Sequence, residues 1–145
     1  MGNQVNEEQL RRRIANGSRD PEDFGQLAGL LTDAGETETA IALLEQGLAL
    51  ASVALVRARL VAQLAWLLYE RTTDVERARV LADEGLRSLT EAPDTPDALF
   101  ARGMLQSLLA HERFTVDPRS GTDMARVAVA TARNLPAFRC TTTSA

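Results

Sequence analysis

Two side chains in this 145-residue chain could take part in covalent or metal chemistry: its one histidine, His111, and its one cysteine, Cys140. His111 stands beside Glu112, as in half of a His-Glu-x-x-His zinc motif, but there is no second histidine to complete it. A cysteine and a histidine can also form a nucleophile–base pair, yet Cys140 falls in the segment 137–145, which has no periodicity and which we expect to be a flexible tail. We therefore expect His111 to face solvent at a helix end, and we predict no catalytic residue and no metal site.

Other reaction motifs are missing from the sequence. The chain contains no lysine, which excludes a phosphate-loop lysine, a Schiff-base lysine and a lysine general base. It also lacks G-x-x-x-x-G-K-[ST], G-x-G-x-x-G and G-x-S-x-G. Adjacent carboxylates such as Glu7-Glu8 and Asp83-Glu84 diverge on a helix, because neighbouring residues point about 100° apart. We predict that the chain is not an enzyme and binds no cofactor.

A run of three arginines, Arg11-Arg12-Arg13, could contact phosphate groups. It lies among acidic residues such as Glu7 and Asp20, and the formal net charge of the chain is −4. A negative chain with one mixed-charge segment has no general attraction to nucleic acid or to an anionic membrane. We therefore expect neither as a partner.

The pattern best suited to binding lies in the segment 53–70, which has no helix breaker and is predicted to be one long helix. Polar and aromatic residues follow i, i+4, i+7, i+10 and i+11 there, at Arg59, Gln63, Trp66, Tyr69 and Glu70. This stripe is offset from an apolar stripe at Leu60, Leu64, Leu67 and Leu68. It holds the chain's one tryptophan and one tyrosine beside polar groups, a mixture typical of a binding surface with aromatic anchors.

Residues of other segments could extend this surface. The candidates are Glu22 and Gln26 before the stripe, and Phe100 and Met104 after it. The alternative is that Trp66 and Phe100 pack against neighbouring helices. The pattern leaves the two interpretations of Trp66 evenly balanced and favours packing for Phe100.

The elements that must position these side chains are clearest in the segment 20–52. Asp20 can cap a helix that begins at Pro21, Gly35 can end it in a left-handed conformation, and Thr37 can cap the next helix. Apolar residues recur at helical spacing at Phe24, Leu27, Ala28 and Leu31, and then at Ala40, Ile41, Leu44, Gly47 and Leu48. Small residues at Ala28, Ala40 and Gly47 allow the two helices to cross closely.

This order of large and small residues resembles a tetratricopeptide repeat. The matching residues are Phe24, Leu27, Ala28, Leu31, Gly35, Ala40, Leu44, Gly47 and Leu48. The resemblance implies an all-α fold, a short right-handed solenoid of about three helical hairpins behind an N-terminal capping helix. It also implies that the first helix of each hairpin lines a concave groove, in which that family holds extended peptide segments.

The rest of the chain is predicted to complete this single domain, 1–136. A capping helix covers 5–15, with Leu10 and Ile14 as its apolar contacts. A second hairpin covers 53–92, with Ala65 as the small residue of its first helix and a Thr73-x-x-Glu76 capping box opening the next. Its Ala78 and Gly85 repeat Ala40 and Gly47 at an offset of 78 − 40 = 38 residues.

The third hairpin, 95–135, is the least regular. Thr95-Pro96 predicts a helix start, and Pro118 and Gly121 favour a loop over 112–122. A final helix then carries Ala125, Ala128, Val129 and Ala132. The offset of 125 − 78 = 47 residues implies an insertion, which we assign to that loop.

Composition is that of an ordinary soluble chain, with 45% hydrophobic and 25% charged residues. We expect no secretion signal from the polar N-terminal residues and no membrane span, since Arg57, Arg59 and Gln63 interrupt the longest apolar segment. We expect a cytoplasmic location.

Three functional hypotheses follow. The first is a non-catalytic module that binds a peptide or partner protein, as a monomer or weak homodimer. The second is a structural or regulatory piece of a larger helical-repeat protein, similar to the repeat arrays of bacterial signalling ATPases and transcription regulators, whose surface serves stacking in a homodimer. The third, an enzyme, rests on His111 alone.

Overall fold

The computed structural model describes residues 6–134, and within them the chain is all-α, with seven helices and no strand. The helices are α1 (Glu7–Ala15), α2 (Pro21–Asp33), α3 (Thr37–Leu50), α4 (Ala54–Arg71), α5 (Val75–Ser88), α6 (Pro96–Val116) and α7 (Pro118–Arg133). The all-α prediction is confirmed. The predictions for 137–145, including Cys140, lie outside the described residues.

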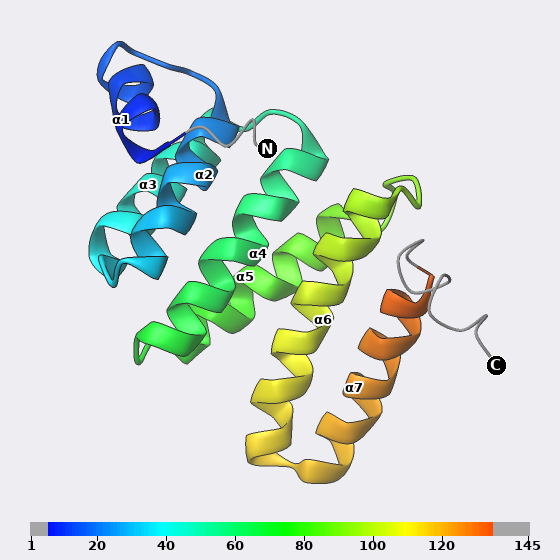
Figure 1. Ribbon diagram of the computed structural model, residues 1–145. Helices are drawn as coiled ribbons and strands as arrows, with labels where there is room; N and C mark the ends of the chain where they lie inside the picture. Colours follow the sequence, from blue (N-terminus) through cyan, green and yellow to red (C-terminus); the bar gives the residue numbers. More distant parts are fainter. Residues whose placement is uncertain (1–5, 135–145) are drawn as a thin grey trace, which may run out of the picture.

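The helices are arranged in two rows that follow the order of the chain (Figure 1). In one row α4 lies between α2 and α6 and contacts both. In the other row α3 packs against α2 and α4, and α5 packs against α4 and α6. α1 lies against α2 at one end of the molecule, and α7 runs along α6 at the other. The polar stripe of 59–70 is therefore on the central helix of the first row.

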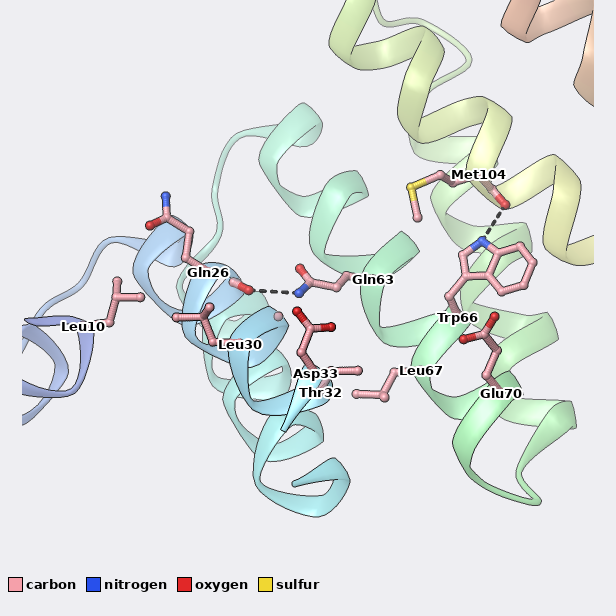
Figure 2. A pocket seen from close by; sticks show the side chains of 12 residues that line it. Leu10, Gln26, Leu30, Thr32, Asp33, Gln63, Trp66, Leu67, Glu70 and Met104 are labelled. Carbon is pink, nitrogen blue, oxygen red and sulfur yellow. Dashed lines mark hydrogen bonds between the residues drawn. The ribbon is translucent and has the colours of Figure 1, made fainter. Parts of the chain in front are cut away.

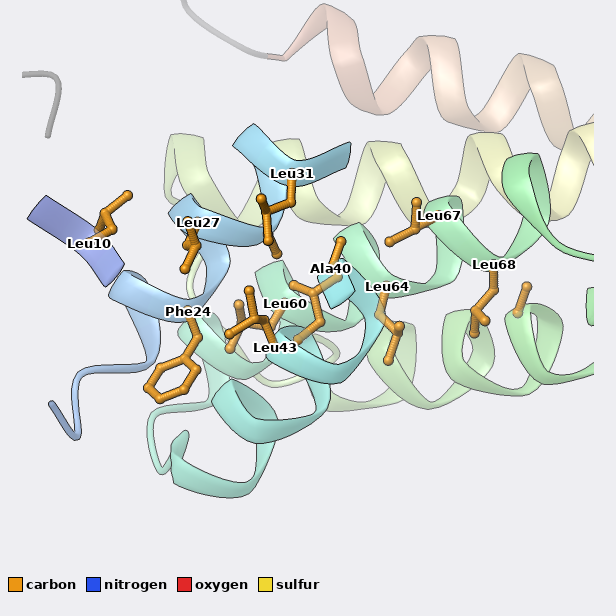
Figure 3. Close-up of a cluster of buried hydrophobic side chains, with 13 residues drawn as sticks. Leu10, Phe24, Leu27, Leu31, Ala40, Leu43, Leu60, Leu64, Leu67 and Leu68 are labelled. Carbon is orange, nitrogen blue, oxygen red and sulfur yellow. The ribbon is translucent and has the colours of Figure 1, made fainter. Parts of the chain in front are cut away.

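Leucines and alanines fill the space between the rows. One cluster consists mainly of side chains from the helices α1, α2, α3 and α4, and its Leu31, Leu44 and Leu64 are fully buried (Figure 3). A second cluster joins α4, α5 and α6 around Leu105 and Leu108. The predicted apolar stripe of α4 is buried at Leu60, Leu64, Leu67 and Leu68. The other flank of α4 is buried as well, at Ala58, Val61, Ala62 and Ala65, so its polar groups occupy a narrow strip between the two buried sides.

The small residues lie at the helix crossings, as predicted. Ala28, Ala40, Gly47, Ala65, Ala78 and Gly85 are all buried. A Cβ on Gly47 would lie 3.0 Å from the Cβ of Phe24 and 3.4 Å from the carbonyl oxygen of Pro21. A Cβ on Gly85 would lie 2.7 Å from a methyl carbon of Leu105. At both glycines a Cβ would be tighter than an ordinary contact, and the neighbouring side chains would have to shift to admit it.

Several helix ends form as the sequence predicts. The Asp20 side chain accepts a hydrogen bond from the Glu22 amide at 3.0 Å, and Pro21 is the first residue of α2. Gly35 ends the turn after α2 with φ of +84°, a conformation that costs glycine little. The Thr95 hydroxyl accepts from the Ala98 amide at 3.2 Å.

Two predicted caps are wrong by one residue. Glu36, not Thr37, holds the N-cap position of α3, and its side chain makes no capping bond. Asp74, not Thr73, caps α5 by accepting from the Arg77 amide at 3.2 Å. The Thr72 hydroxyl accepts from the Asp74 amide and so fixes the turn before this cap.

The predicted loop at 112–122 is also wrong. α6 continues to Val116 and α7 begins at Pro118, so that Asp117 alone separates them. Pro118 is tolerated because a first-turn residue needs no amide hydrogen, and Asp117 caps the helix through the Arg119 amide at 3.2 Å. Gly121 is buried within α7, where its absent Cβ would lie 2.3 Å from the Cα of Phe114.

This hairpin changes the predicted register of the last helix. Ala128 is buried as expected, but Ala125 and Val129 are exposed. The buried small pair of α7 is Gly121 and Ala128, which has the spacing of Ala40 and Gly47. The offset from Ala78 is thus 121 − 78 = 43 residues, shorter than the predicted 47. No inserted loop is needed, because the extra residues lie within the long helix α6.

The N-terminal helix is fastened to α2 by polar and apolar contacts. Leu10 is fully buried in the first cluster, and Ile14 packs against it. Asp23, buried on α2, accepts hydrogen bonds from the Ser18 hydroxyl at 2.7 Å and from Arg13 at 3.3 Å. The other two arginines of the run make ion pairs within α1, Arg11 with Glu7 and Arg12 with Glu8. The run therefore bonds to acidic neighbours in the same domain.

Candidate functional site

Three adjoining hollows lie along one face of the first row, and together we call them the groove. The first hollow, of about 570 Å³, lies between α2 and α4 (Figure 2). The second, of about 330 Å³, lies between the N-terminal halves of α2, α4 and α6. The third, of about 570 Å³, is formed by α4, α6 and α7. They share lining residues: Met104 lines all three, and Trp66 lines the first and third.

The groove gathers all but one of the residues that the sequence singles out. Those that line it are Glu22, Gln26, Arg59, Gln63, Trp66, Glu70, Phe100 and Met104. The α4 members stand on one narrow strip of the helix, beside the buried leucines: Leu67 lines the first hollow and Leu60 the second. The structure thus brings together residues from three helices that are far apart in the sequence. That they bind a partner stays a prediction.

Tyr69 is the exception and lines none of the three hollows. It is half-buried and packs against both core clusters. Its ring meets Trp66 edge-on at a centroid distance of 6.0 Å and His111 at 5.7 Å. Tyr69 therefore supports Trp66 from the side, and the structure offers no groove position for it as an anchor.

Gln63 and Trp66 tie the central helix to its two neighbours. The Gln63 side-chain amide donates to the carbonyl oxygen of Gly25 at 2.9 Å, and the Trp66 indole N–H donates to that of Met104 at 2.9 Å (Figure 2). A Cβ on Gly25 would lie 2.8 Å from Leu60, so α2 approaches α4 closely at this point. Trp66 thus packs against α6 through its N–H while its ring lines two hollows, and its role as an anchor for a partner stays a prediction.

Phe100 differs from the packing role that the sequence favours. Its side chain is 57% exposed and lines the second and third hollows. Exposing a large aromatic side chain to water is unfavourable. When several exposed apolar residues form one patch, the patch often marks an interaction surface. Phe100, Met104 and Trp66 contribute to the apolar part of the groove, together with leucines such as Leu30 and Leu67.

The sequence analysis missed several lining residues, among them Gly29, Asp33, Gly103 and Ser107. A constant spacing of 37 residues between the helices would have found these four. Arg59, Gln63, Trp66 and Glu70 are each preceded by a residue 37 positions earlier on α2, at Glu22, Gln26, Gly29 and Asp33. The same step leads to Phe100, Gly103 and Ser107 on α6. All the residues named in these three sets line the groove. The first-row helices therefore present equivalent positions side by side.

The charges of the groove are unevenly distributed. Glu22 and Arg59 form an ion pair of 2.9 Å across α2 and α4 at the second hollow. Both are substantially exposed, so this pair contributes little stability. Asp33 and Glu70 line the first hollow, and within 6–134 neither makes an ion pair. One end of the groove is neutralised, and the other carries two carboxylates.

The remaining chemical candidates lie away from the groove. His111 is exposed as expected, but it lies within α6 rather than at its end, because the helix continues to Val116. The part of the chain that the structure describes has no cluster of histidine, cysteine and carboxylate side chains that could hold a metal ion. None of the described helices combines the length and the apolar character needed to cross a membrane.

The groove is thus an exposed surface with an apolar centre, formed by side chains that keep their positions through cross-helix hydrogen bonds. In comparisons with protein-family models, with curated proteins and with solved structures, this chain has no significant match.

Proposed function

We propose that the chain is a non-catalytic, cytoplasmic protein-interaction module, which binds an extended peptide segment of a partner in the groove in the manner of a tetratricopeptide repeat. The segment would cross α4 over Trp66 and place side chains in the first and third hollows. Gln26, at the edge of the groove, offers amide groups to its backbone.

The observation that carries this proposal is a pair of glycines on either side of Trp66. Gly29 lies in the middle of α2 and Gly103 in the middle of α6. Each costs its helix about 0.5–1 kcal/mol relative to alanine. Packing does not require them: a Cβ on Gly29 would make only an ordinary contact of 3.5 Å with Gln63, and one on Gly103 would meet nothing within 4 Å. What both glycines do is keep the hollows beside Trp66 open.

Filling the third hollow should therefore weaken peptide binding without weakening the fold. We expect Gly103→Leu to raise the Kd of groove-binding peptides at least tenfold, because the new side chain occupies their space. It should also raise helix stability slightly, since leucine is a better helix former. The measurement uses peptides selected from a random phage-displayed library against the wild-type protein. Binding is followed by the emission of Trp66, the chain's one tryptophan.

A matched control adds the same bulk elsewhere. Ala42 is exposed on α3 and lines none of the three hollows, so Ala42→Leu should leave the Kd unchanged. If the library yields no peptide that shifts the Trp66 emission, or if the selected peptides bind Gly103→Leu as tightly as wild type, the proposal is wrong.

A second candidate function is a stacking unit of a larger helical-repeat assembly or homodimer. It is favoured by the exposed apolar side chains of the last hairpin: Phe114, Val116, Val127 and Val129 are between 50% and 70% exposed. α7 packs along α6, and most of its described side chains are exposed. An unpaired end of this kind is what a further helix pair would cover.

Under this second function, the mass measured by light scattering should rise towards that of a dimer with concentration. Val127→Asp with Val129→Asp should abolish that rise, because two charges cannot be buried unpaired in an interface. A mass that stays monomeric over the whole concentration range rejects stacking and leaves the peptide-binding function as the candidate.

A further inference from the structure

We propose that the groove selects a cationic partner: an extended segment with two apolar side chains and an arginine or lysine between them. This inference rests on the proposed function and adds the chemistry of the ligand. It follows from the charges that line the groove and from the position of the hollows around Trp66.

The ionisable groups of the groove leave an excess of negative charge. Its lining includes Arg59, which is paired with Glu22 at 2.9 Å. The carboxylates of Asp33 and Glu70 stand on the neighbouring helices α2 and α4 at equivalent positions of the 37-residue step. The third member of that position, Ser107, is uncharged. A cation placed between Asp33 and Glu70 would meet two opposite charges, and an anion would meet two like charges.

The aromatic ring adds to the same preference. Trp66 lies one helical turn from Glu70 on α4, and both line the first and third hollows. The indole N–H already donates to the carbonyl of Met104, which leaves the ring as the part of Trp66 that faces the groove. A guanidinium or ammonium group held by Glu70 is within reach of that ring, and the face of tryptophan attracts cations.

The spacing of the apolar side chains comes from the helix packing. The first hollow lies between α2 and α4 and the third extends from α4 over α6 to α7, so the two are displaced by at least one interhelical distance, roughly 8–10 Å. A polyproline-type extended chain rises about 3.1 Å per residue and returns to the same face every three residues. Two apolar side chains about three positions apart therefore reach both hollows. The residue between them passes over Trp66, near the two carboxylates.

The test compares three synthetic peptides that carry leucines three positions apart and differ only in the intervening and flanking residues, which are arginine, glutamate or serine. At low salt we expect the arginine peptide to bind about tenfold more tightly than the glutamate peptide, since each exposed charge pair changes affinity by a few-fold. The difference should shrink to about twofold near 0.5 M salt, because screening acts on exposed charges. The serine peptide should fall between them.

The variant Asp33→Asn with Glu70→Gln should bind the arginine and glutamate peptides equally. Asp83→Asn with Glu91→Gln removes the same charge from exposed positions outside the groove and should retain the preference. An equal loss in both variants would show a general effect of net charge and overturn the inference. So would tighter binding of the glutamate or serine peptide, which leaves the peptide-binding function intact.

Two further outcomes separate this inference from the function on which it rests. If library-selected peptides shift the Trp66 emission but none of the three designed peptides does, the inference is wrong and the proposed function stands. If the wild-type protein is a dimer by light scattering and Gly103→Leu makes it monomeric, the occupant of the groove is a second copy of the chain, and the inference is overturned.

Discussion

Replacing Gly121 by alanine should lower the free energy of unfolding by about 1–3 kcal/mol, the range for overpacked sites. In an ordinary helix interior the same change stabilises by about 0.5–1 kcal/mol. The sign is reversed here because the new Cβ would lie 2.3 Å from the Cα and 2.4 Å from the amide nitrogen of Phe114. These are backbone atoms, so no side-chain rotation relieves the overlap. α7 would have to move away from α6, the helix against which it packs.

Gly103→Ala is the matched control, since it changes the same hairpin by the same atom. Its Cβ meets nothing within 4 Å, so we expect a gain of about 0.5–1 kcal/mol from helix propensity alone. Denaturant unfolding of the three proteins, followed by circular dichroism, measures both changes. If both substitutions raised the free energy of unfolding by the same amount, α6 and α7 would not approach closely at Phe114.

Gly121 also shows why one stretch of the fold could not be predicted from the sequence. Proline and glycine are local signals of a turn, and the segment 112–122 contains both. Pro118 acts within the first turn of a helix, where it is favoured, and Gly121 serves a tertiary contact with Phe114. The sequence alone does not tell a glycine needed for a turn from one needed for close packing, because the packing partner is seven residues away.

Elements with strong local signals were predictable. Asp20 with Pro21 fixes the start of α2, and Gly35 fixes its end, since each acts through bonds or dihedral angles within a few residues. The caps at Thr37 and Thr73 were misplaced by one residue: Asp74 caps α5 with its side chain, whereas Glu36 holds the N-cap position of α3 without a capping bond. Which of two adjacent capping residues takes the position depends on the turn that precedes it.

The candidate site was predicted in outline, and its two errors follow from helix geometry. At about 100° per residue, Arg59, Gln63, Trp66 and Glu70 fall within a sector of about 60° on α4. Tyr69 lies about 60° beyond that sector, on the side that faces α6 and His111. Phe100 was assigned to packing because its type is usually buried, whereas its place depends on how α6 is rotated against α4. That rotation is not visible in the sequence of either helix.

Trp66→Ala should lower the free energy of unfolding by about 3 kcal/mol and also abolish peptide binding. The stability loss is at the lower end of the range for buried tryptophan, because Trp66 is half-buried. It removes the contacts with Tyr69 and the second cluster, and it breaks the hydrogen bond of 2.9 Å to the Met104 carbonyl. Binding is lost because the ring is the common wall of the first and third hollows.

Trp66→Phe separates these two contributions. Phenylalanine retains most of the apolar surface but has no N–H, so stability should fall by about 1 kcal/mol, the usual net value of one hydrogen bond. Peptide binding should be largely kept, measured by the fluorescence anisotropy of labelled peptides because the intrinsic probe is gone. Gly103→Leu gives the opposite pair of effects, with binding lost and stability kept. If folded Trp66→Ala, held well below its unfolding midpoint, bound peptide with an unchanged Kd, Trp66 would be a packing residue alone, and the groove would have to bind through Phe100 and Met104.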